Sequence, residues 1–110
     1  MATSNLNIEI MKMKNFLFEL VQTKREIILQ LAVKHGIYRL RLFGSVARQE
    51  ADELSDVDFL VEMEAQRSLL DMGGFLSDVS QLLGRKVDVV TLNSLKPHIR
   101  ERVLREAIDL

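Results

Sequence analysis

Apolar residues recur at helical spacing in three parts of the chain. The first part runs from about Lys14 to His35, the second from Ser68 to Leu83, and the third follows Ser94. In each part, apolar side chains recur three or four positions apart, which is typical of a helix that buries one face. The pattern therefore predicts three long helices. Their apolar positions include Leu17, Val21, Ile28, Ala32, Phe75, Leu76, Val79, Leu83, Ile99, Val103, Leu104, Ala107 and Ile108.

Shorter apolar segments between these helices have the composition of strands. Residues 38–43, 57–63 and 86–92 are rich in Val, Leu, Phe or Tyr, and polar turns separate them. A short helix at about 45–49 and a polar turn at 50–55 connect the first two strands. The predicted order is α-β-α-β-α-β-α. This order indicates an α/β (α+β) fold in which helices flank a small mixed sheet of about three strands.

The composition describes one folded domain over residues 1–110. The chain is 47% hydrophobic and 28% charged, which provides for one core. We expect residues 1–13 to be a poorly ordered or extended N-terminal segment. The net charge of −1 gives no reason to expect binding to nucleic acid. No apolar run reaches the roughly 20 residues of a membrane span and no signal-peptide pattern begins the chain, so we predict a cytoplasmic protein without membrane contact.

Acidic residues occur inside strands that are otherwise hydrophobic. Asp58 lies in the second predicted strand, and Asp56 shares its face if the strand includes both residues. Asp88 is a third acid, inside the next strand, although the sequence alone does not make the two strands neighbours. Carboxylates on one face repel each other unless a cation lies between them, and oxygen ligands favour Mg²⁺ or Mn²⁺. The chain has no cysteine, which excludes a thiolate site. Asp56 alone could also be a turn residue.

A Gly-Ser pair, Gly44 and Ser45, ends the first predicted strand. Glycine lets the backbone approach a ligand closely, and a helix that begins there directs free N–H groups outward. This pattern predicts a phosphate-binding turn, to which Arg48 could add positive charge. Two other interpretations stay open: Ser45 could cap the helix, and Arg48 could form a surface ion pair with Glu50 or Asp52.

The spacing of these residues resembles a known signature. The string "GS", ten residues and "DVD" match the Gly-Ser-x10-Asp-x-Asp pattern of the polymerase β nucleotidyltransferase superfamily. The wider strings LRLFGSVARQEADELSDVDFLVE, GRKVDVVT and KPHIRERVLREAI are similar to its minimal nucleotidyltransferases, which occur as MntA-type antitoxins of HEPN ribonuclease toxins. The resemblance covers about residues 38–110. One departure is Gln49, which replaces the family's usual glycine and leaves the shape of the following turn in question.

The resemblance implies a role for each matching residue. Asp56 and Asp58 would bind two Mg²⁺ or Mn²⁺ ions, and Asp88 would bind one of them and help to activate the attacking hydroxyl. Gly44 and Ser45 would hold the β- and γ-phosphates of ATP. The reaction would be an in-line attack on the α-phosphorus of ATP that releases pyrophosphate.

The resemblance also implies a partner. A domain of 110 residues has no room for an acceptor-binding extension, so we expect a partner or another subunit to supply the acceptor site. In this family the partner is a HEPN toxin, whose tyrosine hydroxyl would be AMPylated and silenced within a hetero-oligomer. Two alternatives remain. The protein could be an antitoxin that acts by complex formation without catalysis, or a small-molecule nucleotidyltransferase whose homodimer builds the acceptor pocket.

Overall fold

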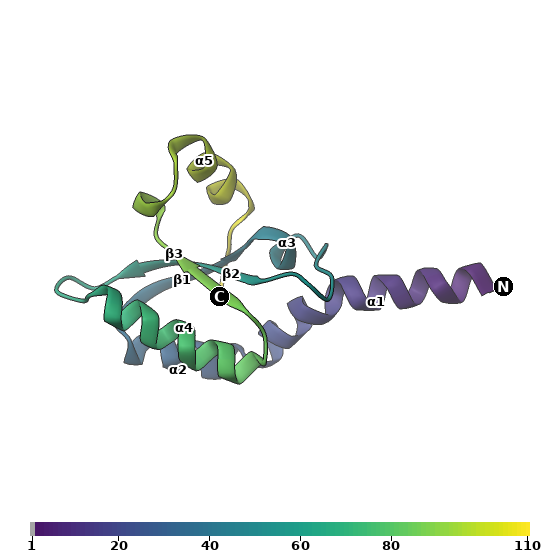
Figure 1. Ribbon diagram of the computed structural model, residues 1–110, viewed down its shortest axis with the longest axis horizontal. Helices are drawn as coiled ribbons and strands as arrows, with labels where there is room; N and C mark the ends of the chain where they lie inside the picture. Colours follow the sequence, from purple (N-terminus) through teal and green to yellow (C-terminus); the bar gives the residue numbers. More distant parts are fainter. Residues whose placement is uncertain (1) are drawn as a thin grey trace.

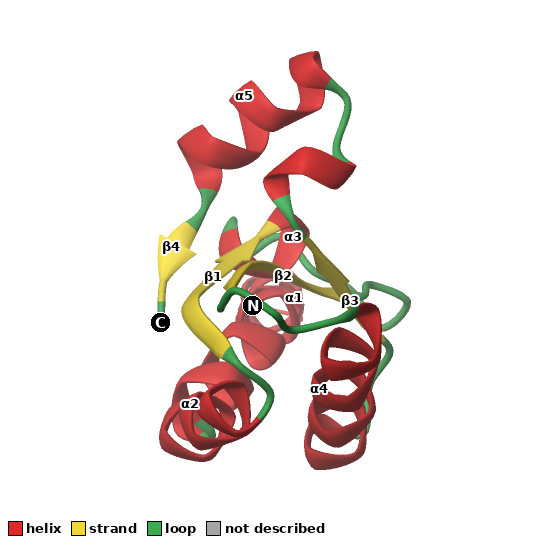
Figure 2. Ribbon diagram, turned by 90° about the vertical axis from the view of Figure 1, so that its left-hand side faces the viewer, coloured by secondary structure: helices red, strands yellow, loops and turns green. Residues whose placement is uncertain are grey.

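A four-stranded sheet with helices on both faces organises the chain (Figures 1 and 2). The structure is a computed structural model that describes the backbone of residues 2–110 and, except at residues 2–6 and 13, their side chains. The sheet order is β3-β2-β1-β4. Strands β1 and β2, and likewise β1 and β4, are antiparallel, whereas β2 and β3 are parallel. The strands are β1 (Ile37–Phe43), β2 (Val57–Met63), β3 (Val87–Val90) and β4 (Ile108–Asp109).

Helices cover the sheet unequally. Figure 2 shows α2 and α4 on one side of the sheet and α5 on the other. The helices are α1 (Ala2–Thr23), α2 (Arg25–Lys34), α3 (Gly44–Ala47), α4 (Leu69–Leu83), the 3₁₀ helix η1 (Leu92–Ser94) and α5 (Pro97–Glu106). Within residues 2–110, no helix has the length and apolar content needed to cross a membrane. The prediction of a small mixed sheet flanked by helices is confirmed, with β4 as an additional strand.

The N-terminal part differs from the sequence prediction in two ways. The single helix predicted over residues 14–35 is two helices, because the backbone at Lys24 leaves helical geometry (φ −93°, ψ 8°). This break lets the apolar faces of both α1 and α2 pack into the core. In addition, α1 begins at Ala2, so residues 2–13 of the segment expected to be poorly ordered or extended are helical, and Figure 1 shows this helix projecting away from the sheet.

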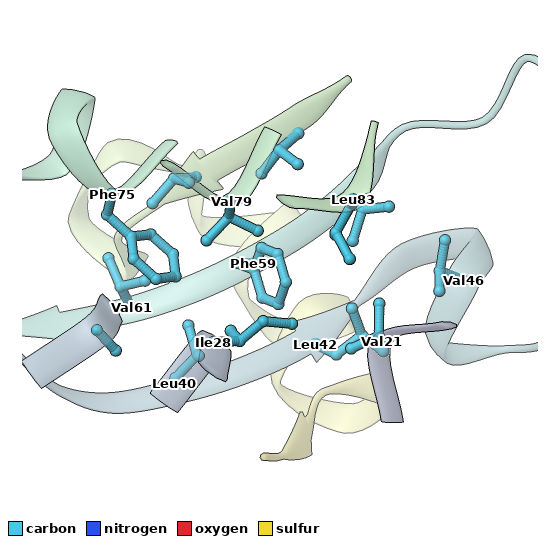
Figure 3. Packing of buried hydrophobic residues seen from close by; sticks show 14 of the residues in the cluster. Val21, Ile28, Leu40, Leu42, Val46, Phe59, Val61, Phe75, Val79 and Leu83 are labelled. Atoms are coloured by element: carbon cyan, nitrogen blue, oxygen red, sulfur yellow. The ribbon is translucent and has the colours of Figure 1, made fainter. Parts of the chain in front are cut away.

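The core lies between the sheet and the α2–α4 layer. Figure 3 shows Phe59 of β2 near its centre, with Phe75 and Val79 of α4 on one side and Ile28 of α2 on the other. The rings of Phe59 and Phe75 meet edge to face, with centroids 5.9 Å apart. Full burial of one such side chain stabilises a fold by about 2–3 kcal/mol. This packing fixes β2 on one face, and alternation along the strand places Asp58, the neighbour of Phe59, on the opposite face.

The C-terminus returns to the sheet. The last predicted helix was expected to include Ala107 and Ile108, but α5 ends at Glu106 and Ala107 is extended (φ −67°, ψ 137°). Strand β4 then pairs with β1, and the Leu110 N–H donates to the Leu40 carbonyl at 3.1 Å. The backbone hydrogen bonds gained by pairing with the free edge of β1 compete successfully with another helical turn.

Candidate active site

Asp58 stands on the sheet face opposite the aromatic core. Its β2 neighbour Phe59 is fully buried, whereas the Asp58 side chain is half-buried. In the parallel pairing of β2 and β3, Asp58 lies directly opposite Asp88. The structure therefore makes the two acid-bearing strands neighbours, as the three-carboxylate hypothesis requires.

Asp56 lies just before β2, and its carboxylate faces a cation of the chain itself. The Nζ atom of Lys86 is 3.6 Å from Asp56 Oδ2, and the Val57 N–H donates to the Lys86 carbonyl at 3.0 Å. Among the side chains that the structure describes, no three acids or histidines come close enough together to hold a metal ion. The structure thus places Asp58 and Asp88 side by side and leaves Asp56 next to them, paired with Lys86.

The electrostatics around Asp58 are unfavourable for its negative charge. The pKa of Asp58 is raised to about 6, mainly by burial and then by the negative charges of Asp88, Asp56 and Glu106, against a smaller opposing effect of Arg48. Carboxylate oxygens that repel one another suit a hard divalent cation such as Mg²⁺ or Mn²⁺. The chemistry of the donor set therefore fits the predicted metal ions.

Gly44 packs directly against Asp58. It has a φ of +76°, which L side chains rarely adopt, and an added Cβ would collide with Asp58 Oδ2. The sequence predicted that Gly44 leaves room for a ligand. In the structure, the group that needs the absence of a side chain at Gly44 is the carboxylate of Asp58. Ser45 lies in the first turn of α3, whose N-cap is Phe43, so the interpretation of Ser45 as the helix cap is wrong.

Arg48 joins two carboxylates. Its Nη1 donates to Glu106 Oε2 at 2.8 Å, and its Nε donates to Glu50 Oε2 at 3.1 Å. Glu106 also accepts a hydrogen bond from the Gly44 N–H, at 3.2 Å. The predicted ion pair between Arg48 and Glu50 is therefore present, whereas the contact with Glu106 was missed because it depends on the return of α5 to the sheet.

The turn after α3 has the left-handed backbone conformation that glycine favours, although the residue at this position is Gln49. Gln49 has a φ of +58°, in the left-handed region. The Glu50 N–H donates to the Ser45 carbonyl at 2.9 Å, which closes the end of α3 in the manner of a C-terminal cap. Replacement of the family's usual glycine by Gln49 thus leaves the turn intact.

Arg85 holds the loop that leads to Asp56. Its Nη2 donates to the carbonyl of Glu53 at 2.6 Å and lies 3.4 Å from the carbonyl oxygens of both Asp52 and Ser55. Hydrogen bonds from an arginine to several carbonyls fix a loop that lacks strand or helix partners. Arg85 follows the cap of α4, so the only signal in the sequence was a basic residue beside a glycine.

Arg85→Ala is expected to loosen this loop. Because three carbonyls lose a charged donor, the free energy of unfolding should fall by about 1–2 kcal/mol, and a smaller loss is expected for Arg85→Lys. Urea unfolding of both variants checks this, with the exposed Arg105→Ala as control. Equal stabilities for Arg85→Ala and the unmodified protein would contradict the proposed restraint.

Comparisons with known proteins agree with this geometry. The family model of the nucleotidyltransferase domain matches residues 21–110. A Methanocaldococcus jannaschii protein, provisionally named a protein adenylyltransferase, is 44% identical over 89 residues, which are 81% of this chain and 95% of that protein. The protein adenylyltransferase MntA of Thermococcus cleftensis is 42% identical over 79 residues, 72% of this chain and 80% of its own.

Solved structures share the fold. One that is provisionally described as a minimal nucleotidyltransferase superposes with a TM-score of 0.77 at 48% identity and covers 84% of this chain and 95% of its own. A toxin–antitoxin complex with AMP-PNP (TM-score 0.63, 20% identity, 74% and 68% coverage) and a tri-AMPylated Shewanella oneidensis HEPN toxin with its MNT antitoxin (0.60, 19%, 80% and 69%) have the same fold. The chain therefore belongs to the nucleotidyltransferase domain family, as the Gly-Ser-x10-Asp-x-Asp spacing predicted.

Proposed function

We propose that this protein is an antitoxin that transfers AMP from ATP to a tyrosine hydroxyl of a HEPN toxin and thereby neutralises it. The observation that carries the proposal is the juxtaposition of Asp58 with Asp88 across β2 and β3, beside the Gly44–Ser45 turn. The names of the related protein adenylyltransferases support the reaction, and the AMPylated HEPN toxin held by a protein of the same fold supports the acceptor.

Three carboxylates would hold the metal ions. Asp56 and Asp58 would bind two Mg²⁺ or Mn²⁺ ions and Asp88 would bind one, once Asp56 gives up its ion pair with Lys86. When bound, these ions would supply positive charge to the α-phosphate and to the departing pyrophosphate. Because Asp58 is half-buried, less water would compete with its carboxylate for the bound ions.

Transfer would proceed by a single displacement. The tyrosine oxygen would form a bond to the α-phosphorus, the bond from that phosphorus to the bridging oxygen of the β-phosphate would break, and pyrophosphate would leave. Asp88 would accept the hydroxyl proton. Gly44 and Ser45 would orient the β- and γ-phosphates so that the leaving oxygen lies in line with the attack.

The acceptor would come from a protein bound beside β3. Asp88 is exposed and lies on the strand at the edge of the sheet, so an incoming hydroxyl can reach it without crossing the fold. We therefore propose a hetero-oligomer with the toxin. Because ATP is the donor, we place the reaction in the cytoplasm.

Radioactive ATP tests the proposed reaction. The protein, Mg²⁺ and a candidate HEPN partner from the same genome are incubated with ATP labelled at the α- or the γ-phosphate, with the double variant Asp56→Asn/Asp58→Asn in parallel. We expect label on the partner from α-labelled ATP only, and none with the double variant. A toxin that both proteins neutralise without label would instead support an antitoxin that acts by complex formation.

A further inference from the structure

We propose that Glu106 is a positioning residue for nucleotidyl transfer: it holds the Gly44–Ser45 turn and Arg48 in place against Asp58. The inference rests on the proposed function, because it assigns Glu106 a role in the same site. Glu106 lies 50 residues after Asp56, outside the Gly-Ser-x10-Asp-x-Asp signature.

Both carboxylate oxygens of Glu106 are used. Oε1 accepts from the Gly44 N–H at 3.2 Å, and Oε2 accepts from Arg48 Nη1 at 2.8 Å. The side chain is only 16% exposed, whereas that of Glu50, the other partner of Arg48, is 64% exposed. Charge-assisted hydrogen bonds shielded from water are stronger than exposed ones, so Glu106 is the main anchor of this turn.

The backbone around Glu106 is fixed from both sides. One turn earlier in α5, Val103 is 1% exposed. Immediately after Glu106 the chain joins the sheet, where Ile108 of β4 pairs with Leu42 of β1. Because β1 ends at Phe43, the same strand carries both β4 and the turn that Glu106 holds. The backbone of Glu106 is thus held by the packing of α5 and the pairing of β4, and its side chain restrains the Gly44–Ser45 turn.

The tolerance at this turn is small. Gly44 has left-handed geometry and lies so close to Asp58 that even a methyl group would collide with its carboxylate. A shift of the Gly44 backbone therefore either strikes Asp58 or opens a gap beside it. Displacements of about 1 Å in an active site reduce rates up to about 100-fold. The negative charge of Glu106 is unfavourable for the carboxylate of Asp58. The benefit that offsets this repulsion is the fixed position that Glu106 gives to the Gly44–Ser45 turn.

A competing explanation uses the same contacts. The Glu106 carboxylate could occupy an N–H group and an arginine that a phosphate would otherwise bind, so that ATP must displace it. The two explanations make opposite predictions for the affinity of the nucleotide when the carboxylate is removed.

Steady-state kinetics of Glu106→Ala and Glu106→Gln, together with calorimetric titration of MgATP, distinguish these explanations. We expect Glu106→Ala to raise KM and the MgATP dissociation constant about 10-fold and to lower kcat about 10-fold, through misplacement of the turn. Glu106→Gln keeps one acceptor oxygen, so each of the three quantities should change only about 2-fold, which is a third of the Glu106→Ala effect on a logarithmic scale. Glu101→Gln, an exposed change on the same helix, should leave all three quantities unaltered.

A double variant adds a readout that a general loss of stability would not produce. If Glu106 acts through Arg48, Arg48→Ala/Glu106→Ala should lose little more than Glu106→Ala alone. Tighter MgATP binding in Glu106→Ala would establish the competing explanation and overturn ours. A lower unfolding temperature with unaltered kinetics and MgATP binding would overturn it too. Failure of the unmodified protein to transfer AMP would refute the proposed function, and the MgATP titrations would then still decide whether Glu106 orders the nucleotide site.

Discussion

Asp58→Asn is expected to abolish AMP transfer and, at neutral pH, to stabilise the fold. Asparagine has almost the same shape, but its amide supplies no negative charge for a cation and only one oxygen ligand. Loss of a ligand to a catalytic metal ion lowers the rate by about 10³-fold or more. A loss of this size cannot be confused with an effect of misfolding, because the variant should unfold at a higher urea concentration than the unmodified protein.

The stabilisation follows from the shifted pKa of Asp58. Its pKa is raised from 3.8 to about 6, first by burial and then by Asp88 and Asp56. The folded state thus binds the proton more tightly than the unfolded state does, and stability falls as the pH rises from about 4 through about 6. Above pH 6 the charged carboxylate destabilises the fold by roughly 1–2 kcal/mol, after allowance for its partial exposure. Asparagine removes that penalty.

Urea unfolding at pH 8 and at pH 4, with chelator present, checks this stabilisation. Asp58→Asn should be the more stable protein at pH 8, and the difference should shrink toward pH 4. Asp78→Asn provides a control of opposite sign, since hydrogen bonding to His35 and the charge of Lys34 lower the pKa of Asp78. A less stable Asp58→Asn protein at pH 8, or one that still transfers AMP, would contradict the assignment.

Gly44→Ala is expected to damage both the fold and the reaction. An alanine at φ +76° adopts a strained backbone, and its Cβ collides with the Asp58 carboxylate. The strain alone destabilises by about 1–2 kcal/mol, and displacement of Asp58 adds to it. A displaced Asp58 should lower the transfer rate about 100-fold.

The matched control is Gly73→Ala. Gly73 lies inside α4 and an added Cβ there meets no atom within 4 Å. Because alanine favours helix, this variant should be about 0.5–1 kcal/mol more stable and equally active. Thermal unfolding and transfer rates of both variants are measured together. A Gly44→Ala protein that retains its stability and activity would show that the close approach to Asp58 is unimportant.

The sheet and the acids could be predicted from sequence because their signals are local. Alternation in β2 and the Val-rich segment of β3 indicate strands without knowledge of the fold, and Asp58 and Asp88 stand out against those apolar neighbours. The Gly-Ser-x10-Asp-x-Asp spacing then identified the family. The break at Lys24 carries no proline or glycine, so the apolar spacing of α1 and α2 could not reveal it.

Residues that act through tertiary contacts could not be predicted in the same way. Glu106 reaches Gly44 only because β4 pairs with β1, and two residues of β4 are too short to give a strand signal. Arg85 contacts carbonyls of a loop about 30 positions earlier. The sequence predicted that glycine is needed at position 44 so that a ligand can approach the backbone closely. In the fold, the group that approaches Gly44 closely is the side chain of Asp58.

Peptide mass spectrometry of the partner tests covalent AMP transfer most directly. A candidate HEPN toxin is incubated with ATP, Mg²⁺ and either this protein or its Asp58→Asn variant, and its peptides are then sequenced. The proposed reaction predicts AMP on a tyrosine of the toxin, formed with the unmodified protein and absent with the variant, together with loss of ribonuclease activity. An unmodified toxin that is nevertheless inhibited in a stable complex would contradict catalysis and leave a protein that neutralises its partner by binding.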